Sequence, residues 1–292
     1  MIENVLKNYA QVFEETLNIF FKPVDSNYKI INDAMQYSLK LGGKRLRPFL
    51  LKEFYSLCGG QGDFSKNFEV AIECIHTYSL IHDDLPCMDN DDFRRGKPSC
   101  HKAFGEANAL LAGDGLLTEA FTIASKTENV DVNNVLKAIE ILSTCAGVRG
   151  MIGGQAIDLL SEGKKVDDTI LKEICLLKTG ALIEAACVIG CTLANASKEK
   201  IDAAKKYANA LGFAFQIRDD ILDCIGDEEK LGKPLHSDQE NDKSTFVTVY
   251  GIDKCKEMVN DLTNKAKAAL EGFGEKSSGL KELADFLCTR NY

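Results

Sequence analysis

Apolar residues recur at helical spacing along almost the whole chain, and this pattern limits it to folds built from helices. Near the start, apolar residues four positions apart predict an amphipathic helix, at Val5, Tyr9, Phe13 and Leu17. Helical spacing returns in the stretches 110–121 and 170–185. Alternating strand patterns are almost absent, and the one β-prone run, 246–250, is too solitary to make a sheet. The sequence therefore predicts an all-α fold.

Helix-breaking residues gather in the charged parts of the chain. Four of the five prolines lie within or beside charged motifs, at Pro48, Pro86, Pro98 and Pro234. Because proline ends or kinks a helix, irregular backbone is expected there. Nothing in the sequence reads as a linker or a repeat. We therefore expect a single domain over residues 1–292, a helical bundle around a deep central cavity.

Charge and cysteine content narrow the class of protein. A net charge of −9 and a pI near 5.1 argue against binding to nucleic acid. The eleven cysteines are odd in number and form no C-x-x-C pair, so we expect reduced thiols in a core. The N-terminus lacks the pattern of a signal peptide, and the run nearest to a membrane span, 181–196, carries Glu184. We expect a cytoplasmic protein without stable membrane anchoring.

The first of two aspartate clusters comprises Asp83, Asp84 and Asp89, followed by Arg94 and Arg95. Carboxylates this close repel one another unless a cation lies between them. Mg²⁺ commonly uses one or two protein carboxylates together with substrate phosphates, and the arginines would suit the remaining phosphate oxygens. On an ideal helix Asp89 falls about 240° from Asp83. A break at Pro86 would bring it back.

The second cluster has the spacing of one helix face. Asp219, Asp220 and Asp223 fall at about 0°, 100° and 40° around a helix, after a mostly apolar stretch, 208–217. Exposed acidic faces usually carry Lys or Arg four residues away, and this one does not. We therefore predict a diphosphate held through Mg²⁺ between two acidic walls. The alternative for the second cluster is a solvated acidic face.

Short basic segments could bind the phosphates. The segment 41–48 has flexible glycines and three cations, which suit a phosphate; alternatively it is an ordinary basic helix start. Lys178 lies in an apolar helical stretch, where an unpaired ammonium is costly unless it meets an anion. We interpret Gly147, Gly150 and Gly154 first as sites of close helix packing and second as a ligand wall.

The histidines suggest a different kind of metal site. The pair His82-Asp83 resembles the motif of the HD phosphohydrolases, all-α enzymes that bind metal through His and Asp. That hypothesis gives the second aspartate cluster no role, so we rank it below the diphosphate site. His76 lies about two turns before Asp83, either as a hydrogen-bonded core residue or as part of the site.

Together these segments resemble the trans-polyprenyl diphosphate synthases, most closely the bacterial farnesyl diphosphate synthases. The similarity covers nearly the whole chain, and its specificity comes from the order of the segments 42–48, 76–92, 94–98, 154–159, 178–180, 215–223 and 232–234. The resemblance implies an all-helical polyprenyl synthase domain around a deep cavity. It also implies a homodimer and a requirement for Mg²⁺, with three ions bound.

The resemblance further implies a role for each matched residue. Mg²⁺ would be bound from the first wall by Asp83 and Asp89, with Asp84 near them, and from the second wall by Asp219, with Asp220 and Asp223 close by. The allylic diphosphate would be held by Arg94, Lys178, Thr179, Gln216 and Lys233. Isopentenyl diphosphate would be held by Gly43, Lys44, Arg47, His76 and Arg95.

The reaction that the resemblance implies is a 1′-4 condensation. Lys178, Thr179 and Gln216 would act in catalysis, as the allylic diphosphate departs and leaves a carbocation in a dry cavity. Isopentenyl diphosphate would attack through its double bond, and the released diphosphate would take the lost proton. The segment 233–245 would close over the substrates and exclude water.

Product length is implied by the residues before Asp83. The bacterial farnesyl synthases have an aromatic residue five positions before this Asp, as Tyr78 is here. Ser79 is small and lies closer in helix angle, at about 40° from Asp83 against about 140° for Tyr78. We predict that isopentenyl diphosphate is condensed with dimethylallyl and geranyl diphosphate to farnesyl diphosphate. The alternatives are a geranylgeranyl diphosphate synthase, a class I terpene cyclase and a non-catalytic subunit.

Overall fold

The structure is a computed structural model that describes residues 2–225 and 244–289. Its elements in the first half are α1 (Ile2–Phe20), α2 (Lys29–Leu39), α3 (Leu46–Leu57), α4 (Lys66–Asp83), β1 (Phe93–Arg94), β2 (Lys97–Pro98), α5 (Cys100–Phe104), α6 (Glu106–Ser125) and α7 (Val132–Ala146). Those in the second half are α8 (Met151–Ser161), α9 (Asp168–Ile174), η1 (Cys175–Gly180), α10 (Ala181–Leu193), α11 (Lys198–Ile225), α14 (Phe246–Tyr250), α15 (Ile252–Ala269), η2 (Glu271–Ser277) and α16 (Ser278–Thr289).

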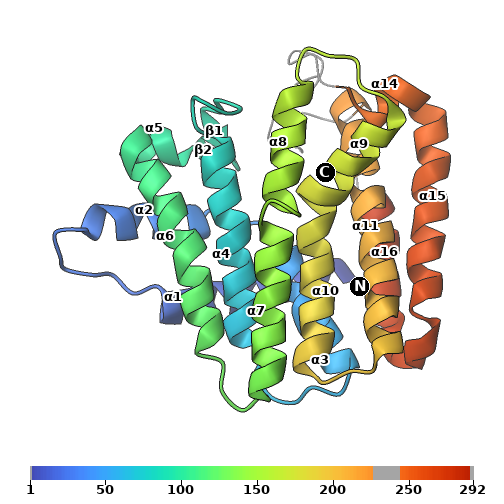
Figure 1. The fold of residues 1–292 in the computed structure, drawn as a ribbon, viewed down its shortest axis with the longest axis horizontal. Coiled ribbons are helices and arrows are strands. Elements are labelled where there is room, and N and C mark those ends of the chain that lie inside the picture. The colour runs from blue at the N-terminus through green and yellow to red at the C-terminus, as the bar shows by residue number, and fades with distance from the viewer. Residues whose placement is uncertain (1, 226–243, 290–292) are drawn as a thin grey trace.

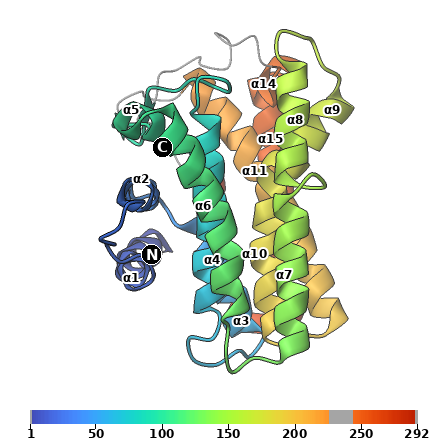
Figure 2. The same cartoon turned by 60° about the vertical axis from the view of Figure 1, so that its left-hand side comes forward.

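Long helices lie alongside one another and form an all-α bundle, which confirms the predicted fold class (Figure 1). α10 lies inside the bundle, because its residues from Leu182 to Leu193 are buried apart from Glu184. A helix that is apolar on every side is typical of an interior position. The helices α3, α7 and α11 pack against it. Figure 2 shows α1 and α2 lying across the outside of the bundle, beside α4 and α6.

The two predicted aspartate clusters come to the same end of the bundle. α4 and α11 both end at the top of the views, where the β1–β2 hairpin and α14 also lie (Figures 1 and 2). The carboxyl end of a helix carries a partial negative charge from its unpaired carbonyl groups. These two helix ends therefore add to the negative charge of the aspartates.

The continuous helical stretch from Asp168 to Leu193 joins α9, η1 and α10. It is long and apolar enough to cross a membrane by length and composition alone, but 61% of its apolar window is buried inside the bundle. The core helix of a globular protein has this character as well.

Two short segments beside the long helices show how local structure forms here. β1 and β2 form a small antiparallel hairpin, with Phe93 opposite Pro98. The β-prone run 246–250 forms helix α14. Thr245 caps this helix, since its hydroxyl accepts a hydrogen bond from the Thr248 N–H at 3.2 Å. Local capping decides the structure of this run, because an isolated strand has no partner for its backbone groups.

Candidate active site

The first aspartate cluster folds back on the end of α4. The helix ends at Asp83, before Pro86, and the Asp89 N–H donates to the Asp83 carbonyl at 2.9 Å. Asn90 adopts a left-handed conformation, with φ of 54°, and its N–H donates to the Leu85 carbonyl at 3.1 Å. This turn confirms the predicted break and returns Asp89 to the helix end.

Asp83 is a carboxylate in an unfavourable electrostatic setting. Burial raises the pKa of Asp83 to about 6; the Lys178 ammonium opposes this shift, and the carboxylates of Asp89 and Asp84 add to it. A cation bound between Asp83 and Asp89 would stabilise their ionised forms. The donor set therefore fits a hard cation such as Mg²⁺.

Asp84 is engaged with Arg94. Its side chain is almost fully buried, and it accepts hydrogen bonds from the Arg94 Nε at 3.0 and 3.2 Å and from the Arg94 Nη2. Burial raises the pKa of Asp84, and the bonds from Arg94 oppose that shift. Asp84 therefore fixes the guanidinium of Arg94 beside the turn that returns Asp89 to Asp83.

In the second cluster, as in the first, one aspartate is held by hydrogen bonds within the protein. Asp220 is buried and accepts from the Gln216 Nε2 at 3.0 Å and from the Phe246 N–H at 2.8 Å, so it joins α11 to α14. Asp223 is buried and Asp219 is half-buried near the end of α11. Within residues 2–225 and 244–289, no three His, Cys, Asp or Glu side chains form a metal site by themselves. Mg²⁺ does not need such a cage where substrate phosphates supply further oxygens.

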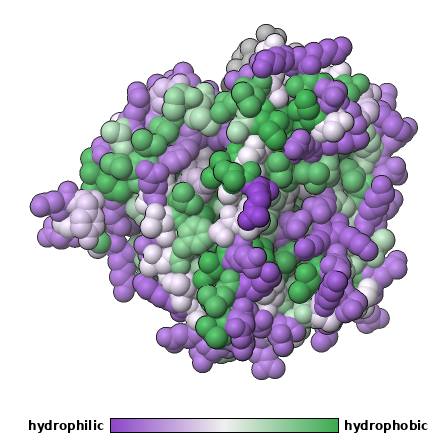
Figure 3. Space-filling model, viewed as in Figure 1, coloured by the Kyte–Doolittle hydropathy of each residue, from purple (hydrophilic) through white to green (hydrophobic). Residues whose placement is uncertain are grey.

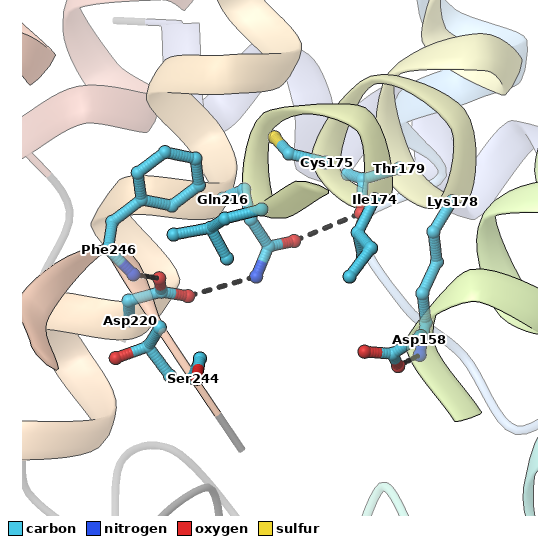
Figure 4. Close-up of a pocket in the computed structure, with 11 residues that line it drawn as sticks. Asp158, Ile174, Cys175, Lys178, Thr179, Gln216, Asp220, Ser244 and Phe246 are labelled. Carbon is cyan, nitrogen blue, oxygen red and sulfur yellow. Dashed lines mark hydrogen bonds and ion pairs between the residues drawn. The ribbon is translucent and has the colours of Figure 1, made fainter. Parts of the chain in front are cut away.

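Figure 4 shows a chain of polar contacts in a small pocket of about 130 Å³ at this wall. The Thr179 hydroxyl donates to the Gln216 Oε1 at 2.9 Å, and Gln216 in turn donates to Asp220. Beside them, the Lys178 Nζ lies 2.6 Å from the Asp158 Oδ2. Lys178 is thus paired with the carboxylate of Asp158 within the protein.

A π-helical turn presents Lys178 and Thr179. η1 inserts one wider turn between α9 and α10, and such turns often occur at functional sites. Gly154 of α8 packs directly against this turn: a Cβ at Gly154 would lie 2.2 Å from the Lys178 backbone nitrogen. The interpretation of Gly154 as a site of close helix packing is confirmed.

A second group of cations surrounds the loop between α2 and α3. The Arg95 Nη1 donates to the Gly42 carbonyl, and Gly43 leaves room for this guanidinium, since a Cβ there would lie 2.6 Å from the Arg95 Cζ. The Arg47 Nη1 lies 3.4 Å from the His76 Nε2, which therefore acts as the acceptor in a neutral ring.

The charges in this group repel one another. Burial lowers the pKa of His76 far below its ordinary value, and Arg47 and Arg95 lower it further. Burial lowers the pKa of Arg47 to about 10, with Glu73 opposing and Arg95 adding to the shift. The buried Arg47 Nε has no hydrogen-bond partner among the described residues. An anion here would relieve the repulsion and accept from that nitrogen.

One cavity adjoins the first aspartate cluster, the Arg47–His76 pair and the η1 turn. It has a volume of about 550 Å³, and its polar lining includes Arg47, His76, Asp83, Lys178 and Thr179. The rest is mostly apolar and includes Leu110, Leu117, Met151, Ile152 and Leu159. Tyr78 and Ser79 both line it, as predicted for residues that contact a growing chain.

Three functional contacts were not predicted from the sequence. Arg45 is buried between Glu14 and Glu73, at 2.5 Å from each, so it serves the fold, whereas Arg47 lines the cavity. Asp158 pairs with Lys178 across 20 positions. His82 lines the cavity. The residues in these contacts are far apart in the sequence, so no local spacing could have predicted them. Lys233 lies outside the described residues, as do Lys243 and Arg290.

Comparison with known proteins identifies the family. The polyprenyl synthetase family model matches residues 28–281. The chain is 43% identical over 283 residues to the farnesyl diphosphate synthase of Escherichia coli, covering 95% of each chain, and 42% identical over 286 residues to the geranylgeranyl diphosphate synthase of Cyanophora paradoxa, covering 96% and 94%.

A solved structure agrees with this assignment. The geranyltransferase of Helicobacter pylori, complexed with magnesium and isoprenyl diphosphate, superposes with a TM-score of 0.85 at 31% identity, covering 98% of this chain and 96% of that one. Sequence and fold agree over nearly the whole length. The chain belongs to the polyprenyl synthetase family.

Proposed function

We propose that this chain is a prenyltransferase that condenses isopentenyl diphosphate with dimethylallyl and geranyl diphosphate to give farnesyl diphosphate. The observation that carries the proposal is a cavity whose lining combines Asp83, Arg47 and Lys178 with many apolar side chains. A diphosphate head and a hydrocarbon tail require these two environments side by side. Relatives named farnesyl diphosphate synthase, 43% and 39% identical over almost their whole length, support it.

Magnesium would be held by Asp83 and Asp89 on one wall and by Asp219 on the other, with Asp84, Asp220 and Asp223 beside them. When bound, it would neutralise charge that develops on the departing diphosphate. The relative from Helicobacter pylori was solved with magnesium, which supports the cofactor. We further propose three ions. The contacts of Asp84 with Arg94 and of Asp220 with Gln216 suit side chains that orient their neighbours.

The diphosphates would be held by different sets of residues. The allylic diphosphate would bind Arg94, Lys178, Thr179, Gln216 and Lys233. The bound diphosphate would compete with the Asp158 carboxylate for the Lys178 ammonium. Isopentenyl diphosphate would bind Gly43, Lys44, Arg47, His76 and Arg95. The Arg47 Nε, which has no hydrogen-bond partner within residues 2–225 and 244–289, supports this second assignment.

The residues present account for the proposed steps. Lys178, Thr179 and Gln216 would hold oxygens of the allylic diphosphate as its C–O bond breaks. The apolar walls would exclude water from the allylic cation. The double bond of isopentenyl diphosphate would form the new C–C bond, and the released diphosphate would take the proton that is lost.

A C20 product is the second candidate. The 42% identity to a geranylgeranyl diphosphate synthase favours it, whereas Tyr78 in the cavity wall favours C15. Purified protein incubated with isopentenyl diphosphate, dimethylallyl diphosphate and Mg²⁺ should yield a C15 product that EDTA abolishes. A C20 product would support the same mechanism and would identify the chain as a geranylgeranyl diphosphate synthase. A folded protein that forms no product would indicate a non-catalytic subunit and contradict the proposal.

The chain is also proposed to act as a cytoplasmic homodimer built from one domain over residues 1–292. Figure 3 shows hydrophobic side chains gathered on the face formed by α6, α7 and α8. Leu111, Leu136 and Val148 are exposed there, at 51%, 60% and 78% of their surface. Exposed apolar side chains that lie on one face can form a contact between proteins. This supports a second copy as the partner.

A further inference from the structure

His82 links the two helices that form one wall of the apolar cavity. It lies on α4 directly before Asp83, and its ring lines the cavity together with Leu110 of α6. The His82 Nε2 lies 3.1 Å from the Leu110 carbonyl oxygen. Because a carbonyl can only accept, this nitrogen carries the proton and donates. The bond fixes the ring against α6.

Gly113 provides the space for this ring. A Cβ at Gly113 would lie 2.1 Å from the His82 Nε2 and 2.4 Å from its Cδ2. Real Cβ atoms do not approach other heavy atoms this closely, so any side chain at Gly113 would displace the imidazole. Since Gly113 is on the α6 side of the ring, the ring would move away from α6.

Tyr78 and His82 form one aromatic pair. They are four positions apart and so share a face of α4. Their ring centroids are 5.7 Å apart at an interplanar angle of 76°, an edge-to-face contact. The Tyr78 hydroxyl is buried without a hydrogen-bond partner among the described residues, and Tyr78 as a whole is 4% exposed. Neither ring can shift without disturbing the other.

We propose that His82 is a specificity-determining residue for product length, and that Gly113 is a positioning residue that sets where its ring lies. The wall that stops the growing chain is then the Tyr78–His82 pair, braced through Leu110 and Gly113, rather than Tyr78 alone. The inference rests on the proposed function. It goes beyond that function because it assigns the length limit to a contact between α4 and α6.

The test compares product lengths of substituted proteins. His82→Ala removes the ring and should increase the share of products longer than C15 about tenfold or more, since a single methylene changes discrimination in an apolar pocket by about 10–200-fold. His82→Phe keeps a ring of similar size without the N–H group. Its products should remain closer to C15 than those of His82→Ala. Tyr78→Ala, made in parallel, should show a shift in the same direction.

Gly113→Ala should shift the products toward C10, because the displaced ring would narrow the cavity. The double variant His82→Ala/Gly113→Ala has no ring to displace, so its products should match those of His82→Ala. It also separates displacement of the ring from a general failure to fold. Gly115→Ala, on the same helix, is the control: its Cβ would approach only the flexible end of Met35, at 2.9 Å from the sulfur.

The outcomes distinguish this inference from the proposed function. If the wild type makes C15 and His82→Ala gives the same products, the proposed function stands and the inference is wrong. If folded His82→Ala and His82→Phe both lose condensation, the residue serves the metal-binding turn and the length-limiting role is also wrong. If the wild type forms no prenyl product, both the function and the inference fall.

Discussion

At the scale of single residues, the charges around the cavity are held in states that a diphosphate or a cation would relieve. Asp83 has a raised pKa beside other carboxylates, and His76 has a lowered pKa beside two arginines. In both cases burial is the largest cause. These side chains therefore reduce the stability of the ligand-free fold and favour ligand binding.

His76 should make stability depend on pH. Its lowered pKa means that the unfolded chain, with a value near 6.5, binds a proton that the folded chain does not. The contribution of His76 to the free energy of unfolding should therefore fall as pH decreases below about 7, by at most about 1.4 kcal/mol per pH unit. Urea titrations at several pH values would measure this slope. His76→Gln should flatten it, and an unchanged slope would contradict the assignment.

Asp83→Ala should abolish condensation while the fold remains intact. Loss of one preorganised electrostatic group at a reacting centre commonly costs about 10²–10³ in rate, and a lost metal ligand should cost at least as much. Product formation with dimethylallyl and isopentenyl diphosphate measures this, with circular dichroism to check the helices. Turnover like that of the wild type would exclude Asp83 as a metal ligand.

At the scale of secondary-structure elements, the active site depends on where helices end and where they touch. α4 ends at Asp83, which allows the chain to turn back and bring Asp89 to the end of the helix. The η1 turn presents Lys178 and Thr179 to the cavity. Gly154 allows α8 to lie against the backbone of that turn. These contacts concern the main chain, which cannot move aside as readily as a long side chain can.

Gly154→Ala should disturb the proposed binding site for the allylic diphosphate. The new Cβ would lie 2.2 Å from the Lys178 nitrogen, so we expect a loss of about 1–3 kcal/mol in stability and a higher KM for the allylic diphosphate. Chemical denaturation and initial rates would measure both. Gly279→Ala is a matched control, because its Cβ meets nothing within 4 Å in α16; it should stabilise slightly. Equal behaviour of the two variants would contradict the packing argument.

At the scale of the whole molecule, the proposed dimer can be tested at the exposed apolar residues of α6, α7 and the turn before α8. Leu136→Lys should shift the protein from dimer to monomer in size-exclusion chromatography with light scattering, because the charge would be buried in the interface. Val12→Lys is the control: Val12 is 59% exposed, close to the 60% of Leu136, but lies on α1. A dimer that persists in Leu136→Lys would place the interface elsewhere.

The sequence by itself determined the features that depend on local spacing. Helical periodicity predicted the all-α bundle, and Pro86 predicted the break that returns Asp89 to Asp83. The order of the motifs identified the family, since it does not depend on packing. Tyr78 and Ser79 were expected to line a cavity, and they do.

Only the tertiary structure decided which charged groups pair with which. Lys44, Arg45 and Arg47 look equivalent in the sequence, yet Arg45 is taken by Glu14 and Glu73, 31 and 28 positions away. Asp84 contacts Arg94, and Lys178 contacts Asp158. These choices follow from which helices pack together and which side chains they bury. A buried charged group must be paired with an opposite charge or a hydrogen-bond partner. The spacing of residues along the chain does not encode which partner this is.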